Sequence, residues 1–139
     1  MPLRYLLDAT TLSDASRTAR FAGITVRMRR YWDSIATASI VWHEMLFGAW
    51  RMPPGQRRAA IEAFLIEEIL PGLPMLPYDR EAASWHAAER ARLTRLGTAP
   101  PFVDGQIAAV AAVNQLVLVT SNVDDFKRFE GLRIEDWRT

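Results

Sequence analysis

Residues 116–120, near the C-terminal end of the chain, constrain the fold more than any other segment. They read Leu-Val-Leu-Val-Thr, a run that is continuous and apolar. A strand that is apolar on both faces is typical of the interior of a parallel sheet, because helices cover that sheet on both sides. The segment therefore predicts a central strand in a fold that combines strands with helices.

Shorter segments of the same kind alternate with helical patterns along the chain. Strands are expected at residues 3–7, 35–39 and 132–135, with a proline-containing extended piece at 73–77. Apolar residues recur at helical spacing in segments 19–32, 41–50, 57–70, 79–97 and 103–115. The alternation predicts one α/β domain over residues 1–139. We expect a central parallel sheet of about four to five strands, with helices on both faces.

Polar residues at the ends of the predicted helices indicate where these helices begin and end. Asp79 is expected to cap a long helix that closes at Gly97. Either Thr37 or Ser39 is expected to cap the helix at residues 41–50.

The composition narrows the class of protein. Half of the 139 residues are hydrophobic, which is enough for one sizeable core. The absence of cysteine excludes disulfides and thiolate chemistry and favours a reducing compartment. The N-terminal apolar run is too short for a signal peptide or a membrane helix, so we expect a cytoplasmic protein. A net charge of +1 predicts local rather than broad contacts with nucleic acid.

Polar residues directly follow two of the predicted strands. Asp8 comes after the first strand. The segment Thr-Ser-Asn-Val-Asp-Asp at residues 120–125 comes at the end of the strand that begins at residue 116. In an open parallel sheet, the binding crevice lies beyond the carboxyl ends of the strands. If both strands are central, these polar groups face the same crevice.

Two further carboxylates belong to predicted helices. Glu44 borders an apolar stripe, where an unpaired carboxylate is costly. Asp104 lies in the first turn of an alanine-rich helix, where the helix dipole favours its ionised form. Together with Asp8 and Asp125 they would repel one another in one crevice, and a divalent cation is the usual compensation. Oxygen ligands without cysteine or a histidine pair select Mg²⁺ or Mn²⁺, which serve phosphate chemistry.

Four segments resemble, in order and spacing, the motifs of PIN-domain ribonucleases, and among these the VapC toxins of type II toxin–antitoxin pairs. The segments are YLLDAT at 5–10, SIVWHEMLFGA at 39–49, DGQIAA at 104–109 and LVTSNVDDF at 118–126. The tail GLRIEDW at 131–137 is similar as well. The resemblance spans residues 3–137, and the ordered set is far more specific than any single motif.

This resemblance implies a single PIN-like domain that cuts RNA with Mg²⁺ or Mn²⁺, by means of a metal-activated water. It assigns catalysis and metal binding to one set of residues: Asp8, Glu44, Asp104 and Asp125. It assigns the positioning of substrate or of a neighbouring carboxylate to a second set: Thr10, Thr120 and Asn122. It also implies a homodimer and a cognate VapB-type antitoxin that lies across the active-site groove.

Three positions depart from the family pattern. Thr10 stands where many relatives have asparagine, and its hydroxyl can still bond to phosphate or water. Ser121 stands where relatives often have arginine, so one expected substrate contact is missing. Asn122 occupies a position that is acidic in some members. Asp125 is therefore the better candidate for the fourth carboxylate, although the sequence leaves open which of the two completes the metal site.

Each acidic residue also has a simpler explanation when it is taken alone. Asp8 can cap a helix, and Glu44 can be an ordinary surface residue. Asp104 can be a first-turn acid that the helix dipole favours, and Asp124 with Asp125 can form a turn. Only their joint occurrence in one ordered pattern favours a site.

Other polar residues have open interpretations. His43 and His86 are expected to have packing or surface roles. One group of arginines forms either a solvated helix face or a surface that binds RNA phosphate or an acidic antitoxin segment. This group is Arg17, Arg20, Arg27, Arg29 and Arg30.

Two other functions are alternatives to a ribonuclease. A phosphatase of the haloacid dehalogenase type needs a second aspartate two residues after the first, where this chain has Thr10. It also needs a phosphate-binding lysine, and Lys127 is the only lysine in the chain. A PIN fold that has lost activity and only binds RNA or protein is the other alternative. The presence of all four carboxylates argues against it.

Overall fold

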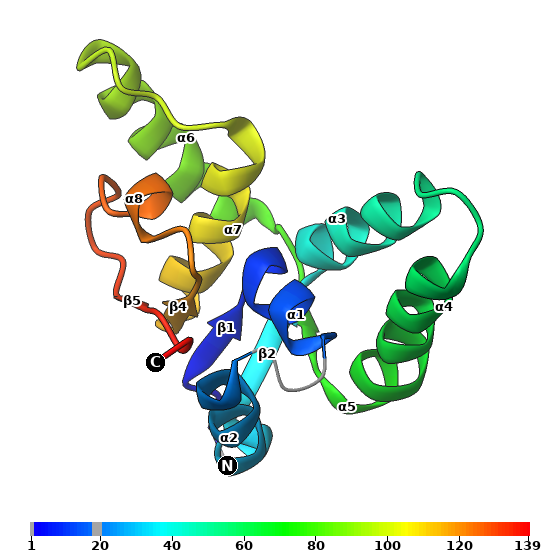
Figure 1. The fold of residues 1–139 in the computed structure, drawn as a ribbon. Coiled ribbons are helices and arrows are strands. Elements are labelled where there is room, and N and C mark those ends of the chain that lie inside the picture. The colour runs from blue at the N-terminus through cyan, green and yellow to red at the C-terminus, as the bar shows by residue number, and fades with distance from the viewer. Residues whose placement is uncertain (1, 18–20) are drawn as a thin grey trace.

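Five parallel strands form the central sheet of the computed structural model, which describes residues 2–17 and 21–139 (Figure 1). In sheet order they are β3 (Met75–Leu76), β2 (Ile35–Ala38), β1 (Tyr5–Leu7), β4 (Val117–Val119) and β5 (Ile134–Glu135). Leu6 of β1 lies opposite Ala36 of β2 and Leu118 of β4. Every pair of neighbouring strands is parallel, as the apolar strand pattern predicts.

The order of the strands reverses once along the chain, beside β1. The chain passes from β1 to β2 and β3 on one side and then returns to β4 and β5 on the other. The connections that leave β1 and β4 therefore diverge, and a crevice opens between the carboxyl ends of these neighbours. Asp8 and Thr120 directly follow the two strands that border this crevice.

Helices flank the sheet. The connection from β1 to β2 holds α1 (Ala9–Ala15), α2 (Ala22–Arg30) and the 3₁₀ turn η1 (Trp32–Ser34). Between β2 and β3 lie α3 (Ser39–Trp50), α4 (Gln56–Ala63), the π-helical segment η2 (Phe64–Ile69) and α5 (Leu70–Gly72). β4 is preceded by α6 (Arg80–Arg95) and α7 (Phe102–Val113) and followed by α8 (Val123–Phe126). In Figure 1, α3 to α5 lie to the right of the sheet and α6 to α8 to its left. The helices thus lie on both sides of the sheet, as predicted (Figure 1).

The core lies between the sheet and these helices. All residues of β1 and β2 are buried. α7 contributes four consecutive residues without exposed surface: Ala108, Ala109, Val110 and Ala111. The small side chains of α7 suit its close contacts with α6 and β4. This packing holds the N-terminal turn of α7, which carries Asp104, at a set place relative to β4.

One local expectation, the cap of α3, is wrong, and the reason is physical. Neither Thr37 nor Ser39 caps α3, because the N-cap residue is Ala38 and no side chain bonds there. The hydroxyl of Thr37 instead donates to the carbonyl of Leu7 at 2.8 Å and so joins β2 to β1. The helix expected at residues 57–70 is present, and its second half, η2, is π-helical. The expected cap of α6 by Asp79 is confirmed.

The helix expected from residue 19 corresponds to α2, which begins at Ala22. Ala19 and Arg20 lie outside the described residues. Among residues 2–17 and 21–139, no helix combines the length and the apolar character that a membrane crossing requires.

Candidate active site

Asp8 is the first residue beyond β1, and its side chain is buried. It caps α1, because its Oδ1 accepts hydrogen bonds from the Thr11 backbone N–H at 3.0 Å and from the Thr10 hydroxyl at 2.8 Å. The Asp8 N–H donates to the carbonyl of Val119 in β4 at 3.1 Å. Burial raises the pKa of Asp8, and hydrogen bonds from the nearby threonines offset part of that rise. The carboxylate is thus fixed between the ends of β1 and β4.

Thr10 connects Asp8 to the turn that follows β4. Its hydroxyl donates its proton to Asp8 and accepts a hydrogen bond from the Ser121 N–H at 3.1 Å. The hydroxyl oxygens of Thr10 and Thr120 lie 3.4 Å apart, and that of Thr120 accepts from the Asn122 N–H at 3.0 Å. The family resemblance assigns to both threonines the positioning of a substrate or of a neighbouring carboxylate. In the structure, both hydroxyl groups lie beside Asp8. Hydrogen bonds between residues 110 or more positions apart therefore shape the site.

Asp104 lies in the first turn of α7 and is partly buried. Its pKa is raised from 3.8 to about 6. Burial is the largest cause, and the negative charges of three further carboxylates add to it: Asp125, Asp8 and Glu44. Charges act in this way only over short distances. Asp8, Glu44, Asp104 and Asp125 thus form one acidic cluster, in which α3, α7 and α8 each supply one member.

The two adjacent aspartates of α8 differ in their surroundings. Asp124 has an 88% exposed side chain and forms an ion pair with Lys127 at 2.9 Å. Asp125 raises the pKa of Asp104, whereas Asp124 does not contribute. Asn122 is exposed, and its backbone N–H is engaged by Thr120. Of the two aspartates of α8, Asp125 is therefore the one whose charge acts on Asp104.

The donor set of the acidic cluster fits Mg²⁺ or Mn²⁺ in its chemistry. Its members offer only carboxylate oxygens, and their mutual repulsion, seen in the pKa of Asp104, is what a bound cation relieves. Within residues 2–17 and 21–139, no three Asp, Glu, His or Cys side chains converge at the spacing of a complete metal cage. Mg²⁺ does not need such a cage, because it retains several waters and uses one or two carboxylates together with substrate phosphate.

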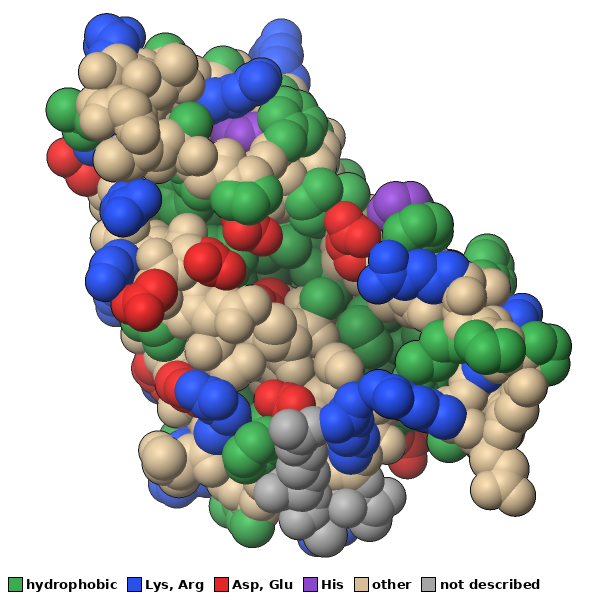
Figure 2. Space-filling model, turned by 45° about the horizontal axis from the view of Figure 1, so that its top comes forward, with side chains coloured by type: hydrophobic (Ala, Val, Ile, Leu, Met, Phe, Trp, Pro, Cys, Tyr) green, Lys and Arg blue, Asp and Glu red, His purple; other side chains and the backbone are tan. Residues whose placement is uncertain are grey.

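The surface around the cluster is hollowed. Figure 2 shows acidic side chains around a depression with hydrophobic walls, and basic side chains farther out on the same face. Beside Asp8 lies a cleft of about 450 Å³, and the residues that line it include Thr10, Ser121 and Arg138. Sequence reasoning missed Arg138. Its position was not foreseeable, because it depends on how the C-terminal residues fold back over β4.

His86 supports the turn that carries Asp104. Its buried ring accepts or donates a 2.8 Å hydrogen bond with the Tyr78 hydroxyl and lies 4.8 Å from the ring of Phe102. A Cβ atom on Gly105 would lie 2.1 Å from His86 Nε2, so only glycine fits there. His86 thus has the packing role expected of it, and its surroundings explain why glycine follows Asp104. His43 is exposed.

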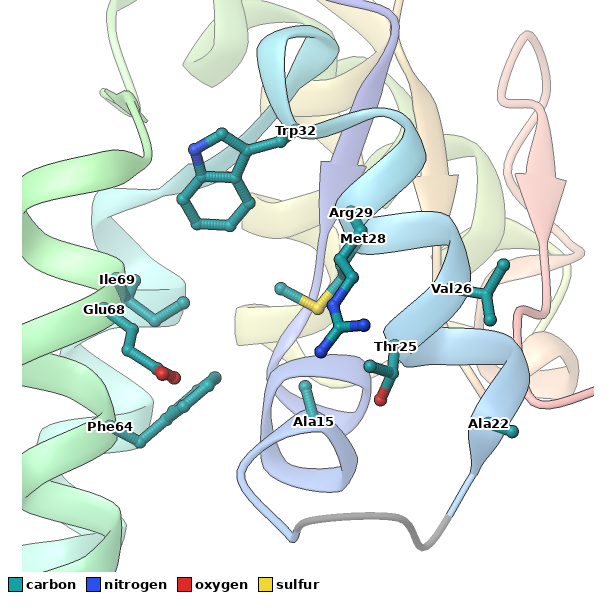
Figure 3. Close-up of a pocket in the computed structure, with 10 residues that line it drawn as sticks. All are labelled: Ala15, Ala22, Thr25, Val26, Met28, Arg29, Trp32, Phe64, Glu68 and Ile69. Atoms are coloured by element: carbon teal, nitrogen blue, oxygen red, sulfur yellow. The ribbon is translucent and has the colours of Figure 1, made fainter.

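A second concave surface lies apart from the acidic cluster. This apolar groove has a volume of about 930 Å³ between α2 and η2. In Figure 3, Phe64, Glu68 and Ile69 point into it from η2, and Met28 and Arg29 approach from α2. Among the arginines considered above, Arg29 therefore lines a groove, while Arg27 bonds to the carbonyls of residues 137 and 139.

Known proteins are similar to this chain in both sequence and fold. The PIN domain family matches residues 5–132. The tRNA(fMet)-specific endonuclease VapC of Salmonella typhimurium is 32% identical over 97% of this chain and 98% of its own length. The protein of the same name from Shigella flexneri is 30% identical, again over 97% of this chain and 98% of its own length.

Solved structures agree with this. The structure titled DNA bound VapBC from Salmonella typhimurium has a chain that is 32% identical, with a TM-score of 0.85 over 97% of this chain and 98% of that one. FitAcB from Neisseria gonorrhoeae, at 21% identity, shares the fold with a TM-score of 0.84 over 95% of this chain and 96% of that one. With its parallel sheet and its four motifs in order, the chain belongs to the VapC family of PIN-domain proteins.

Proposed function

We propose that the chain is the toxin of a VapBC-type toxin–antitoxin pair and acts as an endoribonuclease that depends on Mg²⁺ or Mn²⁺. The surroundings of Asp104 carry this proposal. Burial raises its pKa most, and the negative charges of Asp125, Asp8 and Glu44 raise it further, so four carboxylates lie close to one another. A bound cation stabilises such a cluster of negative charges. The names of the Salmonella and Shigella relatives, both tRNA(fMet)-specific endonucleases, support RNA as the class of substrate.

The residues that would hold the ion are those of the acidic cluster: Asp8, Glu44, Asp104 and Asp125. When bound, the ion supplies an activated water and stabilises charge on the phosphate oxygens. Thr10 and Thr11 hold Oδ1 of Asp8, so that the carboxylate loses little conformational freedom on binding. Thr120 fixes the backbone of the next turn, and its exposed residue Asn122 would contact the substrate.

Cleavage of a pooled RNA library by the purified protein tests this proposal. We expect cutting with Mg²⁺ or Mn²⁺, none with EDTA, and a loss of about 100-fold or more in Asp8→Asn and Asp104→Asn. Asp124→Asn is the matched control, because Asp124 is exposed and paired with Lys127. It should cut like the wild type. Folded wild-type protein, free of antitoxin, that cuts no RNA in any metal would instead support the inactive binding module.

The surroundings of Lys127 weigh against the phosphatase alternative. Lys127 pairs with Asp124 on the exposed surface of α8, with a side chain that is 57% exposed. Thr10, at the position of the acid–base aspartate, already uses its proton in the bond to Asp8. Neither residue is arranged for aspartyl-phosphate chemistry.

We also propose that a cognate VapB-type antitoxin binds this protein, with one part across the active-site groove and another in the apolar groove between α2 and η2. The solved VapBC complexes support such a partner, and the groove offers apolar side chains such as Phe64 and Ile69 for an incoming segment. Coexpression of Phe64→Asp with the cognate antitoxin tests this. We expect loss of the complex with RNA cleavage intact, whereas undiminished capture would contradict it.

A further inference from the structure

The last residues of the chain are held firmly against the body of the protein. Trp137 is buried, and its ring centroid lies 5.0 Å from that of Tyr5 and 5.9 Å from that of Tyr31. Its indole N–H donates to a carboxylate oxygen of Glu135 at 3.0 Å. An aromatic anchor of this kind fixes the backbone on both sides of it.

Helix α2 clamps the same residues from the other side. Nη1 of Arg27 donates to the carbonyl of Trp137 at 2.9 Å and to that of Thr139 at 2.6 Å. A Cβ on Gly23 would lie 2.6 Å from the Trp137 carbonyl, so glycine is needed for this approach. Residues 137–139 therefore have a fixed position against the fold, and so does the backbone from which the Arg138 side chain extends.

The Arg138 guanidinium is itself held in place. Nε and Nη2 donate to the carboxylate of Asp136 at 2.7–3.1 Å, and Nη2 also reaches the carbonyl of Ser121 at 3.4 Å. Its Cζ lies 6.0 Å from the centre of the Phe21 ring. Among the described residues, these hydrogen bonds leave the two N–H groups of Nη1 unused. A guanidinium that is held along one edge is ready to bind an anion along another.

The place of Arg138 relative to the acidic cluster determines what it can bind. Arg138 lines the 450 Å³ cleft together with Thr10 and Ser121. A chain of hydrogen-bonding contacts runs from Arg138 through Ser121 and Thr10 to Asp8. The cleft thus lies beside the turn and the hydroxyl that hold the Asp8 carboxylate. Arg138 is the cationic residue in its lining, and Asp14 is the acidic one.

We propose that Arg138 binds a phosphate of the RNA strand next to the phosphodiester that is cut, and so positions the strand across the acidic cluster. This inference rests on the proposed ribonuclease function. A polyanionic substrate that approaches four carboxylates needs a fixed cation beside them, and the C-terminal residues supply it. The bond to Asp136 orients the guanidinium without using Nη1, and the side chain remains 41% exposed for contact with substrate.

The test compares Arg138→Gln, Arg138→Lys and the control Arg95→Gln, whose arginine is exposed at the end of α6. With labelled single-stranded RNA and Mg²⁺, we expect KM to rise roughly tenfold in Arg138→Gln with kcat within about twofold. Arg138→Lys should recover part of this loss, because it restores the charge but not the fork. Arg95→Gln should match the wild type. A change in kcat or thermal stability alone would show a merely structural role and overturn the inference.

The salt dependence of RNA binding separates this inference from the proposed function. It is measured in an Asp104→Asn background, which we expect to bind RNA without cutting it. Loss of one phosphate contact should reduce the slope of log Kd against log salt by about 0.7 for a single strand. An unchanged slope and affinity in Arg138→Gln would overturn the inference even if the protein is a ribonuclease. Wild-type protein that cuts no RNA refutes the proposed function, while the binding measurement still decides the role of Arg138.

Discussion

The ionisation of Asp104 depends strongly on its burial and on its charged neighbours. Its pKa is about 6 in the folded protein, whereas the ordinary value for aspartate is 3.8. The folded state therefore binds this proton more tightly than the unfolded state. In the absence of metal, the free energy of unfolding should fall as the pH rises from about 4 through about 6, because the charged form meets burial and three negative charges.

Asp104→Asn removes this contribution, so thermal melts in EDTA between pH 4.5 and 8 provide the test. The variant should melt at a higher temperature than the wild type at pH 8, on the order of 3 °C, and the two should approach each other near pH 4.5. Saturating Mg²⁺ should stabilise the wild type more than the variant. Parallel melting curves for the two proteins across this range would contradict the assigned environment of Asp104.

Thr10 is the residue that couples Asp8 to the turn after β4. Thr10→Val keeps the shape of the side chain but removes the donor to Asp8 and the acceptor for the Ser121 N–H. Each lost bond is worth about 1–2 kcal/mol, and the one to the carboxylate is the stronger. We expect kcat/KM for RNA to fall about 10- to 100-fold in Thr10→Val and much less in Thr10→Ser. Equal activities of the two variants would show that the hydroxyl has no part in the site.

Four carboxylates of the site could be named from the sequence, whereas Arg138 could not, and their positions in the fold explain the difference. The four are Asp8, Glu44, Asp104 and Asp125. Asp8 follows a strand, and Asp104 and Asp125 stand in the first turns of helices. Glu44 lies inside α3, beside its apolar stripe. Arg138 reaches the cleft through contacts with Ser121 and Phe21, and neither contact leaves a pattern in the sequence. Similarly, Thr10 could be identified as a polar neighbour of Asp8, but its bond to Ser121 joins positions 111 residues apart.

The segment after α8 is attached to α6 by one buried carboxylate. Glu89 accepts hydrogen bonds from Nε and Nη2 of Arg92 at 2.8 and 2.9 Å and from the Glu130 N–H at 2.7 Å. The Arg92 bonds lower the pKa of Glu89, while its burial opposes this. The charged form is thus stabilised in the fold, and its contribution is lost as the pH falls through that lowered pKa.

Glu89→Ala should lower the free energy of unfolding by about 1–3 kcal/mol at pH 7, because it leaves the Glu130 N–H without its acceptor and removes two hydrogen bonds of Arg92. Glu130→Ala is the control, since the Glu130 side chain is 76% exposed and pairs with Arg92 only at 3.6 Å. It should cost less than about 0.5 kcal/mol. Urea denaturation measures both. Equal losses in the two variants would mean that Glu89 does not hold the segment.

Strands and helices were predictable where local chemistry and tertiary structure agree. The strand at residues 116–120 became β4, and Asp79 caps α6. The prediction for the start of α3 was wrong because Thr37 bonds across the sheet to Leu7, a contact that propensity does not reflect. The π-helical turn η2 was not predictable either, since residues 57–70 keep a helical apolar pattern through it.

Taken as a whole, the molecule leaves apolar side chains of α3 exposed beside the acidic cluster. Phe47 and Trp50 are 52% and 57% exposed, and they line a cleft with His43 and Leu46. Large exposed aromatic groups on one helix are typical of a protein interface. This surface is our candidate for the homodimer contact that the family resemblance implies.

Light scattering coupled to size exclusion tests the dimer. The wild type should elute as a dimer, and Trp50→Glu should be monomeric with an unchanged circular dichroism spectrum. Val26→Glu is the control, because Val26 is 60% exposed and lies on α2, whereas this surface belongs to α3. A monomeric wild type, or a dimer that survives Trp50→Glu, would contradict this interface.

The claim on which the function depends is that the acidic cluster holds a divalent cation, and Mn²⁺ binding followed by electron paramagnetic resonance tests it most directly. The wild type should bind Mn²⁺, with affinity reduced about tenfold or more in Asp8→Asn, Asp104→Asn and Asp125→Asn. Asp124→Asn, which alters the exposed neighbour of Asp125, should bind like the wild type. Wild-type protein that binds no Mn²⁺, or Asp104→Asn that binds it with unchanged affinity, would contradict the assignment of the metal site.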